Sequence, residues 1–340
     1  MAIQQTGPSG TEVNTPTVLA GQVNRLHTLL VVSSWELHRL LSARSTRLTT
    51  LALILLLAGI MWLRKEVTVI AYFVPEEERV YVHGGSAWGM VYSMPLLVLV
   101  FGIIVPFLSA DGVARDLKQR THELLMSTAI PSWAYVWGRF LAVLVLDLLL
   151  ATLLLATTLL IGVVFALAMG HPFPNIAATF FLWVVAVLPA ILLISGLSFG
   201  IGTLFPRYSG LGKVLIVVAW FLVSYEGLLV RGDETSSVYW DPTSRAMIGA
   251  LGEVYQRELF NGIDTVPVGS GGGGQQQVLV PATQFTQEEK VRELRLRILD
   301  VEQHMPDLWP WAGPHLVLAM IGLGGTAIAV ARFRRFSDVL

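Results

Sequence analysis

The sequence contains no cysteine and is poor in charged residues. With no cysteine among its 340 residues, the chain can form no disulfide, no thiolate nucleophile and no Cys-ligated metal site. Charged residues make up 14% of the sequence and hydrophobic residues 54%, whereas soluble domains carry about a quarter charged residues. This composition predicts a membrane protein. No basic cluster indicates a nucleic-acid partner, and the net charge of −1 is uninformative because the charges are segregated along the chain.

A second histidine is missing from the one stretch that begins like a zinc site. The sequence RTHELLMS, residues 120–127, starts like the His-Glu-x-x-His motif of zinc proteases, but Met126 occupies the position of the second histidine. The other histidines are scattered, at positions 27, 38, 83, 171, 304 and 315. We therefore expect no metal site and no catalytic site. An intramembrane metalloprotease is the third-ranked hypothesis, and elemental analysis showing no metal would dispose of it.

The sequence is instead rich in long apolar segments. A bilayer core about 30 Å thick needs about 20 helical residues to cross it. Six segments meet or approach this length: 48–63, 87–110, 141–169, 176–205, 214–230 and 308–330. Five or seven spans are the alternatives, because the first segment is short and the fourth could break at Pro189. The fold class predicted is therefore an all-α polytopic membrane protein with six transmembrane helices.

The distribution of lysine and arginine predicts the orientation of these spans. With the N-terminus inside, the cytoplasmic segments carry many more basic residues than the two short outer loops, as the positive-inside rule requires. The segment 231–307, before the last span, is the one long outer connection, and long segments cross largely regardless of charge. We expect a multi-pass protein of the plasma membrane, in contact with lipid, with both termini in the cytoplasm.

The remaining segments complete the predicted domain organisation. Residues 1–23 are polar and read as a disordered lead, 24–230 form the transmembrane region, and 308–340 form the last span and a cytoplasmic tail. Residues 24–44 have an apolar face and predict an amphipathic helix in the membrane interface, with a solvated helix packed on a partner as the alternative. The extracytoplasmic region 231–307 contains a flexible linker at 270–277 and predicts a small helical cap.

Residues 111–140 join the second and third predicted spans. They contain, in order, Arg115-Asp116, a Thr-His-Glu-Leu-Leu run starting at Thr121, and then Ser127, Pro131, Trp133 and Gly138-Arg139. This order resembles the loop after the second span in membrane subunits of type-2 ABC exporters, except that Arg120 replaces the usual glycine. Residues 35–41 are similar to that family's elbow helix, and the six-span layout and the long outer connection agree with it too.

The resemblance implies a permease, the transmembrane subunit of an ATP-driven exporter of an unidentified substrate. It implies two such subunits, identical or related, and two ATP-binding cassette subunits that carry the ATP and Mg²⁺. The loop 111–130 would be the coupling helix, with Glu123 contacting a basic residue of an ATP-binding subunit; the alternative is that Glu123 lies on a solvated helix face. The coupling residues would be Arg115, Asp116, Arg120, Thr121, Glu123 and Leu124.

A phosphate-binding loop is also absent. The nearest candidate, residues 209–214, lacks the first glycine at the required spacing and has Val214 where Mg²⁺ needs a hydroxyl. We therefore expect this chain to bind no cofactor itself and to be a non-catalytic subunit, with ATP hydrolysis on a separate polypeptide.

Two carboxylates fall inside predicted spans, where ionisable groups are costly. Asp147 would line the inner part of a transport path and Glu226 an outer gate. The alternatives are a structural hydrogen bond between helices for Asp147 and snorkelling to the outer interface for Glu226. Gly196 and Gly200 have the spacing of a close packing face, within one chain or in a dimer.

One hypothesis from another class stays open beside the permease. The chain could be a non-transporting membrane scaffold that recruits an extracytoplasmic protein partner through 231–307 and transmits a mechanical signal. A continuous polar path between subunits would favour transport, and a closed seam would favour the scaffold.

Overall fold

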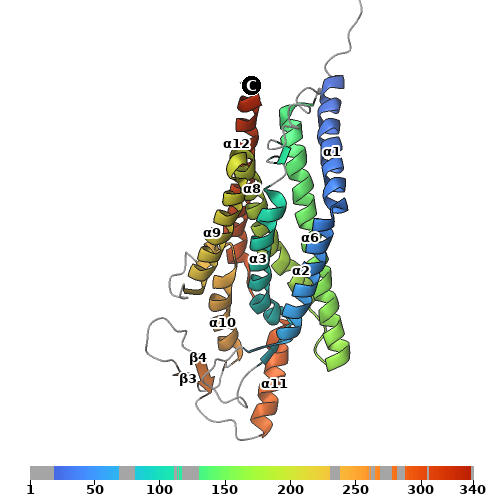
Figure 1. The fold of residues 1–340 in the computed structure, drawn as a ribbon. Coiled ribbons are helices and arrows are strands. Elements are labelled where there is room, and N and C mark those ends of the chain that lie inside the picture. The colour runs from blue at the N-terminus through green and yellow to red at the C-terminus, as the bar shows by residue number, and fades with distance from the viewer. Residues whose placement is uncertain are drawn as a thin grey trace, which may run out of the picture.

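The protein is a helical bundle in a computed structural model (Figure 1). The structure describes residues 19–68, 81–110, 113, 115–116, 130–229, 238–259, 261, 265–268, 278–281, 288–304 and 306–337. The predicted disordered lead and the predicted linker at 270–277 lie outside these residues, apart from the beginning of the first helix.

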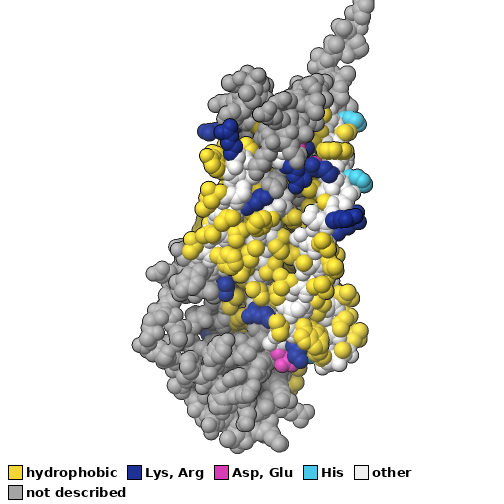
Figure 2. Space-filling model, viewed as in Figure 1, with side chains coloured by type: hydrophobic (Ala, Val, Ile, Leu, Met, Phe, Trp, Pro, Cys, Tyr) yellow, Lys and Arg dark blue, Asp and Glu magenta, His cyan; other side chains and the backbone are white. Residues whose placement is uncertain are grey.

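Six helical segments in the described part of the chain are long and apolar enough to span a membrane. They are α2 (Arg44–Leu63), α3 (Ala87–Ser109), α6 (Ser132–Met169), the run α7–η2–α8 (Ile176–Leu204), α9 (Ser209–Leu229) and α12 (Trp309–Ser337). Figure 2 shows a broad apolar surface around the middle of the bundle, with lysine and arginine above and below it. The number of these helices matches the six predicted spans, and the helices indicate a multi-pass membrane protein.

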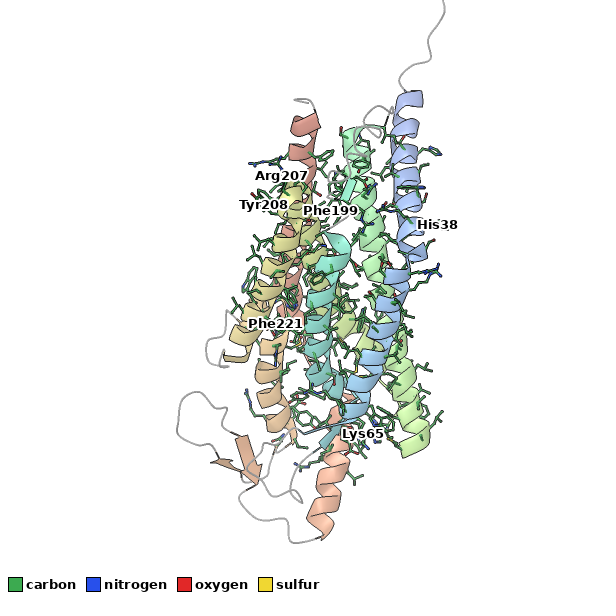
Figure 3. The ribbon with its side chains drawn as sticks, viewed as in Figure 1. His38, Lys65, Phe199, Arg207, Tyr208 and Phe221 are labelled. Carbon is green, nitrogen blue, oxygen red and sulfur yellow. The ribbon has the colours of Figure 1, made fainter. Side chains whose placement is uncertain are left out.

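The two ends of the bundle differ. The start of α1 (Leu19–Ser42) and the end of α12 lie together at one end, which we call the terminal end (Figure 1). The opposite end, which we call the cap end, carries α10 (Arg245–Leu259), α11 (Glu288–Gln303) and two antiparallel hairpins. The hairpins pair β1 (Glu66–Thr68) with β2 (Tyr81–His83), and β3 (Thr265–Val268) with β4 (Val278–Pro281). Figure 3 places Arg207 toward the terminal end and Lys65 at the cap end.

Helix α6 is longer than its apolar run predicts. Its 38 residues extend about 57 Å, roughly twice the thickness of a bilayer core. The helix begins at Ser132, directly after Pro131, and so includes Arg139, which precedes the predicted span. It ends at Gly170, whose φ of 71° is the left-handed conformation that glycine adopts most readily at a helix end. The long helix therefore connects the terminal end to the cap end.

The fourth span does not break at Pro189. A π-helical turn, η2 (Trp183–Val187), joins α7 (Ile176–Leu182) to α8 (Leu188–Leu204), and Pro189 stands at the second residue of α8. Proline has no N–H to donate and its ring crowds the preceding turn. A wider turn before it accommodates both effects without ending the helix.

Helices α8 and α12 pack backbone to backbone. A Cβ added at Gly196 would lie 2.2 Å from the carbonyl oxygen of Gly322, and one added at Gly322 would lie 2.4 Å from that of Leu192. Thr326 also donates a hydrogen bond of 3.2 Å to the Gly196 carbonyl. The predicted packing face at Gly196 is thus used within one chain, and we call the Gly196–Gly322 contact the glycine seam.

The cap shares a core with the membrane helices. Met247, Leu251, Tyr255 and Leu259 of α10 are buried in the same apolar cluster as residues of α3, and the ring of Tyr255 meets that of Trp88 edge-on at 4.9 Å. The described part of 231–307 is therefore packed on the bundle. The predicted cap helices match α10 and α11.

Helix α1 packs along α6. Figure 1 shows it roughly parallel to α6 and beyond the end of α2, separated from α2 only by Ala43. Its apolar residues Leu26, Leu30 and Trp35 are exposed. The amphipathic helix predicted at 24–44 is present, and its position in the membrane interface stays a prediction.

Candidate functional site

A buried cluster of charged side chains joins three segments of the chain at the terminal end. Arg139 of α6 and Glu36 of α1 are 2% and 0% exposed, and Asp116 comes from the described part of the loop after α3. The Arg139 guanidinium forms an ion pair with Asp116 through Nη2, and its Nη1 lies 3.7 Å from Glu36 Oε2. An arginine so deeply buried is stable only when carboxylates compensate its charge.

Two further side chains complete this cluster. Tyr135 donates a hydrogen bond of 2.6 Å to Asp116 Oδ2, and its ring centroid lies 4.9 Å from the Arg139 guanidinium carbon. Arg39 forms an ion pair with the other oxygen of Glu36. We call these five residues, Glu36, Arg39, Asp116, Tyr135 and Arg139, the ion cluster.

Local sequence explains how the ion cluster is assembled. Tyr135 and Arg139 are four residues apart on α6, so they share one face of the helix. Between them, Gly138 leaves room for α1, because a Cβ there would lie 2.8 Å from Val32 Cγ1 and 3.1 Å from the Leu29 carbonyl oxygen. The Gly-Arg pair noted in the sequence thus brings two helices together and supplies the cation between them.

Apolar side chains pack into a second core at this end of the bundle. They come from α6, α8, α12 and the described part of the loop after α3. The buried members are Val113, Tyr135, Val136, Phe140, Phe199, Val330 and Phe333. A low-dielectric setting strengthens the attraction within the ion cluster and raises the cost of removing any one member.

The structure describes two of the six predicted coupling residues. Arg115 is exposed and Asp116 is buried in the ion cluster. The other four, Arg120, Thr121, Glu123 and Leu124, lie outside the described residues. Sequence reasoning did not pair Asp116 with Glu36 or Tyr135, because these residues are far apart in the chain. The i,i+3 spacing of Glu36 and Arg39 was the one local signal that could have drawn attention to α1.

Asp147 lies between three helices of the bundle. It is completely buried on α6, and its Oδ2 accepts a hydrogen bond of 3.1 Å from Ser109 of α3 and one of 2.6 Å from Ser195 of α8. The interhelical hydrogen bond that was the structural alternative for Asp147 is therefore present. A role in a transport path stays a prediction. Glu226 lies in α9, and its side chain is not among those the structure describes.

Polar side chains also meet at the cap end. His83 of β2 is bonded to Glu302 of α11, and the His171 ring lies beside that of His83. Among the described residues, no group of three or more His, Asp or Glu side chains is arranged to hold a metal ion.

Comparison with known proteins identifies no relative. No protein-family model, no curated protein and no solved structure matches the chain. The resemblance to exporter permeases therefore depends on the order of residues within 111–140, the helix at 24–44 and the six-span layout.

Proposed function

We propose that the chain is the transmembrane permease subunit of an ATP-driven exporter. Two copies, or one copy and a related chain, form the pathway in the plasma membrane. Two separate ATP-binding subunits bind ATP and Mg²⁺ and act on the cytoplasmic loop 111–130, the coupling segment. The terminal end then faces the cytoplasm and the cap end faces outward.

The observation that carries this proposal is the ion cluster. A coupling segment must pass a displacement to the membrane helices, and Asp116 attaches the described part of this loop to Arg139 of α6 and, through it, to Glu36 of α1. Because the charges are buried, moving Asp116 away from Arg139 would cost several kcal/mol. The loop and the two helices are therefore expected to move together.

Helix α3 offers a second connection. Its last turn precedes the coupling segment directly, and its other end packs against α10, α11 and β2 of the cap. A displacement received after Ser109 would reach the cap through this helix, since a helix is stiff along its axis. Export, as opposed to import, is proposed on the family resemblance alone.

The experiment purifies the chain from its own cells together with any ATP-binding subunit that it retains. We expect an ATP-binding subunit to co-purify with the chain, and ATPase coupling to be lost on Glu123→Arg and on deletion of 117–126. A charge reversal of exposed Glu258 at the cap end is the matched control and should leave coupling unchanged. Full coupling in both loop variants, or a wild-type chain that binds no ATP-binding subunit, would refute the proposal.

The scaffold hypothesis is supported by one specific observation, the core shared by α3 and α10. A chain in which the cap moves together with the membrane helices could transmit a mechanical signal to an extracytoplasmic protein without transporting anything. A reconstituted complex that hydrolyses ATP and alters binding of such a partner, but moves no solute between compartments, would favour the scaffold.

A further inference from the structure

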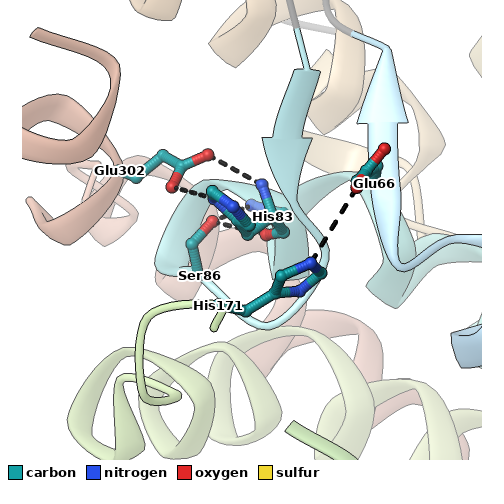
Figure 4. A network of polar contacts seen from close by, with 6 residues as sticks. Glu66, His83, Ser86, His171 and Glu302 are labelled. Carbon is teal, nitrogen blue, oxygen red and sulfur yellow. Dashed lines mark hydrogen bonds and ion pairs between the residues drawn. The ribbon is translucent and has the colours of Figure 1, made fainter. Parts of the chain in front are cut away.

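A buried glutamate fastens α11 to the bundle at the cap end. Glu302 is 1% exposed, and both of its carboxylate oxygens are bonded to one residue (Figure 4). Oε1 accepts a hydrogen bond of 2.7 Å from the backbone N–H of His83, and Oε2 lies 2.9 Å from His83 Nδ1. His83 ends β2, and its carbonyl accepts a hydrogen bond from Ser86, the N-cap of α3. One carboxylate thus ties the cap to a spanning helix.

A second histidine lies against the first. His171, just after Gly170 at the end of α6, has its ring centroid 4.6 Å from that of His83, with the rings edge to face. On its other side, His171 Nε2 is 3.9 Å from Glu66 Oε1 of β1 (Figure 4). The four residues Glu66, His83, His171 and Glu302 come from β1, β2, the end of α6 and α11, and we call them the outer latch.

Charged groups from several surrounding elements face the rings of His83 and His171. Glu302 of α11 and Glu66 of β1 attract protons to both histidines, whereas Lys65 and His83 disfavour a charge on His171. Burial raises the pKa of the Tyr255 phenol on α10, and the nearby Glu302 carboxylate raises it further, so the tyrosine stays neutral throughout the range in which histidine titrates.

We propose that the outer latch is a proton-sensitive fastening, which holds α11 against the bundle near neutral pH and releases it in acid and in alkali. The proposal does not depend on ATP-driven export, since it concerns only how the cap is held. It goes beyond the proposed function by giving the cap end a signal of its own, the proton concentration on its side of the membrane.

The pKa values of the two histidines are shifted in opposite directions. The hydrogen bond to Glu302 raises the pKa of His83 above 6.5, although burial acts against it. Burial and the neighbouring His83 lower the pKa of His171 below 6.5. The closed state, in which the outer latch holds α11 against the bundle, is therefore stabilised fully by His83 when the pH is below 6.5. This stabilisation is lost as the pH rises through the raised pKa of His83. His171 does not destabilise the closed state above pH 6.5. It weakens the closed state as the pH falls from 6.5 through the lowered pKa of His171.

The sum of these two effects is a maximum of closure near the ordinary histidine pKa of 6.5. In acid, two imidazolium rings in contact repel each other. In alkali, the loss of the His83 proton leaves the Glu302 carboxylate without its cation. The loss of the closed state in acid is thus due to His171, and its loss in alkali is due to His83.

The test measures the distance between α11 and the start of α7 in the full-length chain in lipid nanodiscs. Nitroxide labels are attached at Phe173→Cys and Gln303→Cys, since Phe173 and Gln303 are exposed and Asn175 donates a hydrogen bond of 3.2 Å to the Gln303 carbonyl. No background cysteine has to be removed. We expect spin–spin broadening to be greatest near pH 6.5 and to fall on both sides.

Two variants separate the acid fall in spin–spin broadening from the alkaline fall. His171→Phe, which keeps an aromatic ring, should lose the acid fall and keep the alkaline one, whereas Glu302→Gln should lose the alkaline fall. His83→Gln is a second variant for the alkaline fall if Glu302→Gln does not fold. Broadening that stays constant with pH in the wild-type chain overturns the proposal, as does an acid fall that persists in His171→Phe. Neither result bears on ATPase coupling.

Discussion

At the scale of single residues, the most consequential side chain is Arg139. Its guanidinium lies between carboxylates from two other segments and is almost completely buried. Arg139→Gln would leave Glu36 and Asp116 buried without a compensating charge, and breaking such a cluster costs about 3–5 kcal/mol. We expect a matching loss of unfolding free energy in denaturant titration of the solubilised protein. Arg332→Gln, an exposed arginine on α12, is the control and should change stability little; equal losses would contradict a structural role for the cluster.

Ser195 and Ser198 of α8 form a second residue-scale comparison. Both are fully buried, but only Ser195 donates to Asp147, and Ser198 Oγ has no hydrogen-bond partner among the described residues. A buried hydrogen bond contributes about 0.5–1.5 kcal/mol, and its loss would leave Asp147 Oδ2 with Ser109 alone, so Ser195→Ala should lower thermal stability. Ser198→Ala should be neutral or slightly stabilising. If the two variants melt alike, Ser195 does not hold Asp147 in place.

At the scale of elements, the glycine seam makes the sharpest prediction. Gly322→Ala would force a Cβ to 2.4 Å from the Leu192 carbonyl oxygen, whereas a Cβ at Gly324 on the same helix meets nothing within 4 Å. Overpacking typically costs about 1–3 kcal/mol, and alanine gains up to about 1 kcal/mol over glycine in a helix. We therefore expect opposite shifts in melting temperature for Gly322→Ala and Gly324→Ala. Shifts of the same sign would show that α8 and α12 do not pack as described.

Element boundaries show where sequence patterns stop being informative. Apolar runs located all six spans because the bilayer demands length and hydrophobicity, which are visible locally. They did not indicate that α6 begins before its apolar run, since Arg139 interrupts the apolar pattern and is stable there only because Asp116 and Glu36 come to it from other segments. They could not predict the π-helical turn before Pro189 either, because that adjustment depends on how α8 is held by its neighbours.

At the scale of the whole molecule, orientation can be tested with a chain that has no cysteine of its own. We expect single cysteines at exposed His27 of α1 and Arg332 of α12, both toward the terminal end, to react with a membrane-impermeant maleimide only after cells are opened. Cysteines at exposed Asp300 and Gln303, at the cap end, should react in intact cells. The reverse pattern would place the coupling segment outside and would remove the basis for the proposed function.

Sequence patterns predicted the architecture better than the sites. Span number, the amphipathic first helix and the cap helices follow from periodicity within a short stretch. The ion cluster and the outer latch each combine residues far apart in the sequence, as when Glu302 meets His83. Nothing in the local pattern distinguishes these carboxylates from solvated ones, so the pairs became visible only in three dimensions.

The uninterrupted length of α6 has a mechanical consequence. A rod of about 57 Å converts each degree of tilt at its base into about 1 Å of travel at its tip. Near the start of α6, Arg139 forms an ion pair with Asp116. His171 lies two residues after the last residue of α6, where its ring contacts that of His83. A tilt of a few degrees at the terminal end would therefore move the cap end of α6 by a few ångströms, at the point where His171 meets His83.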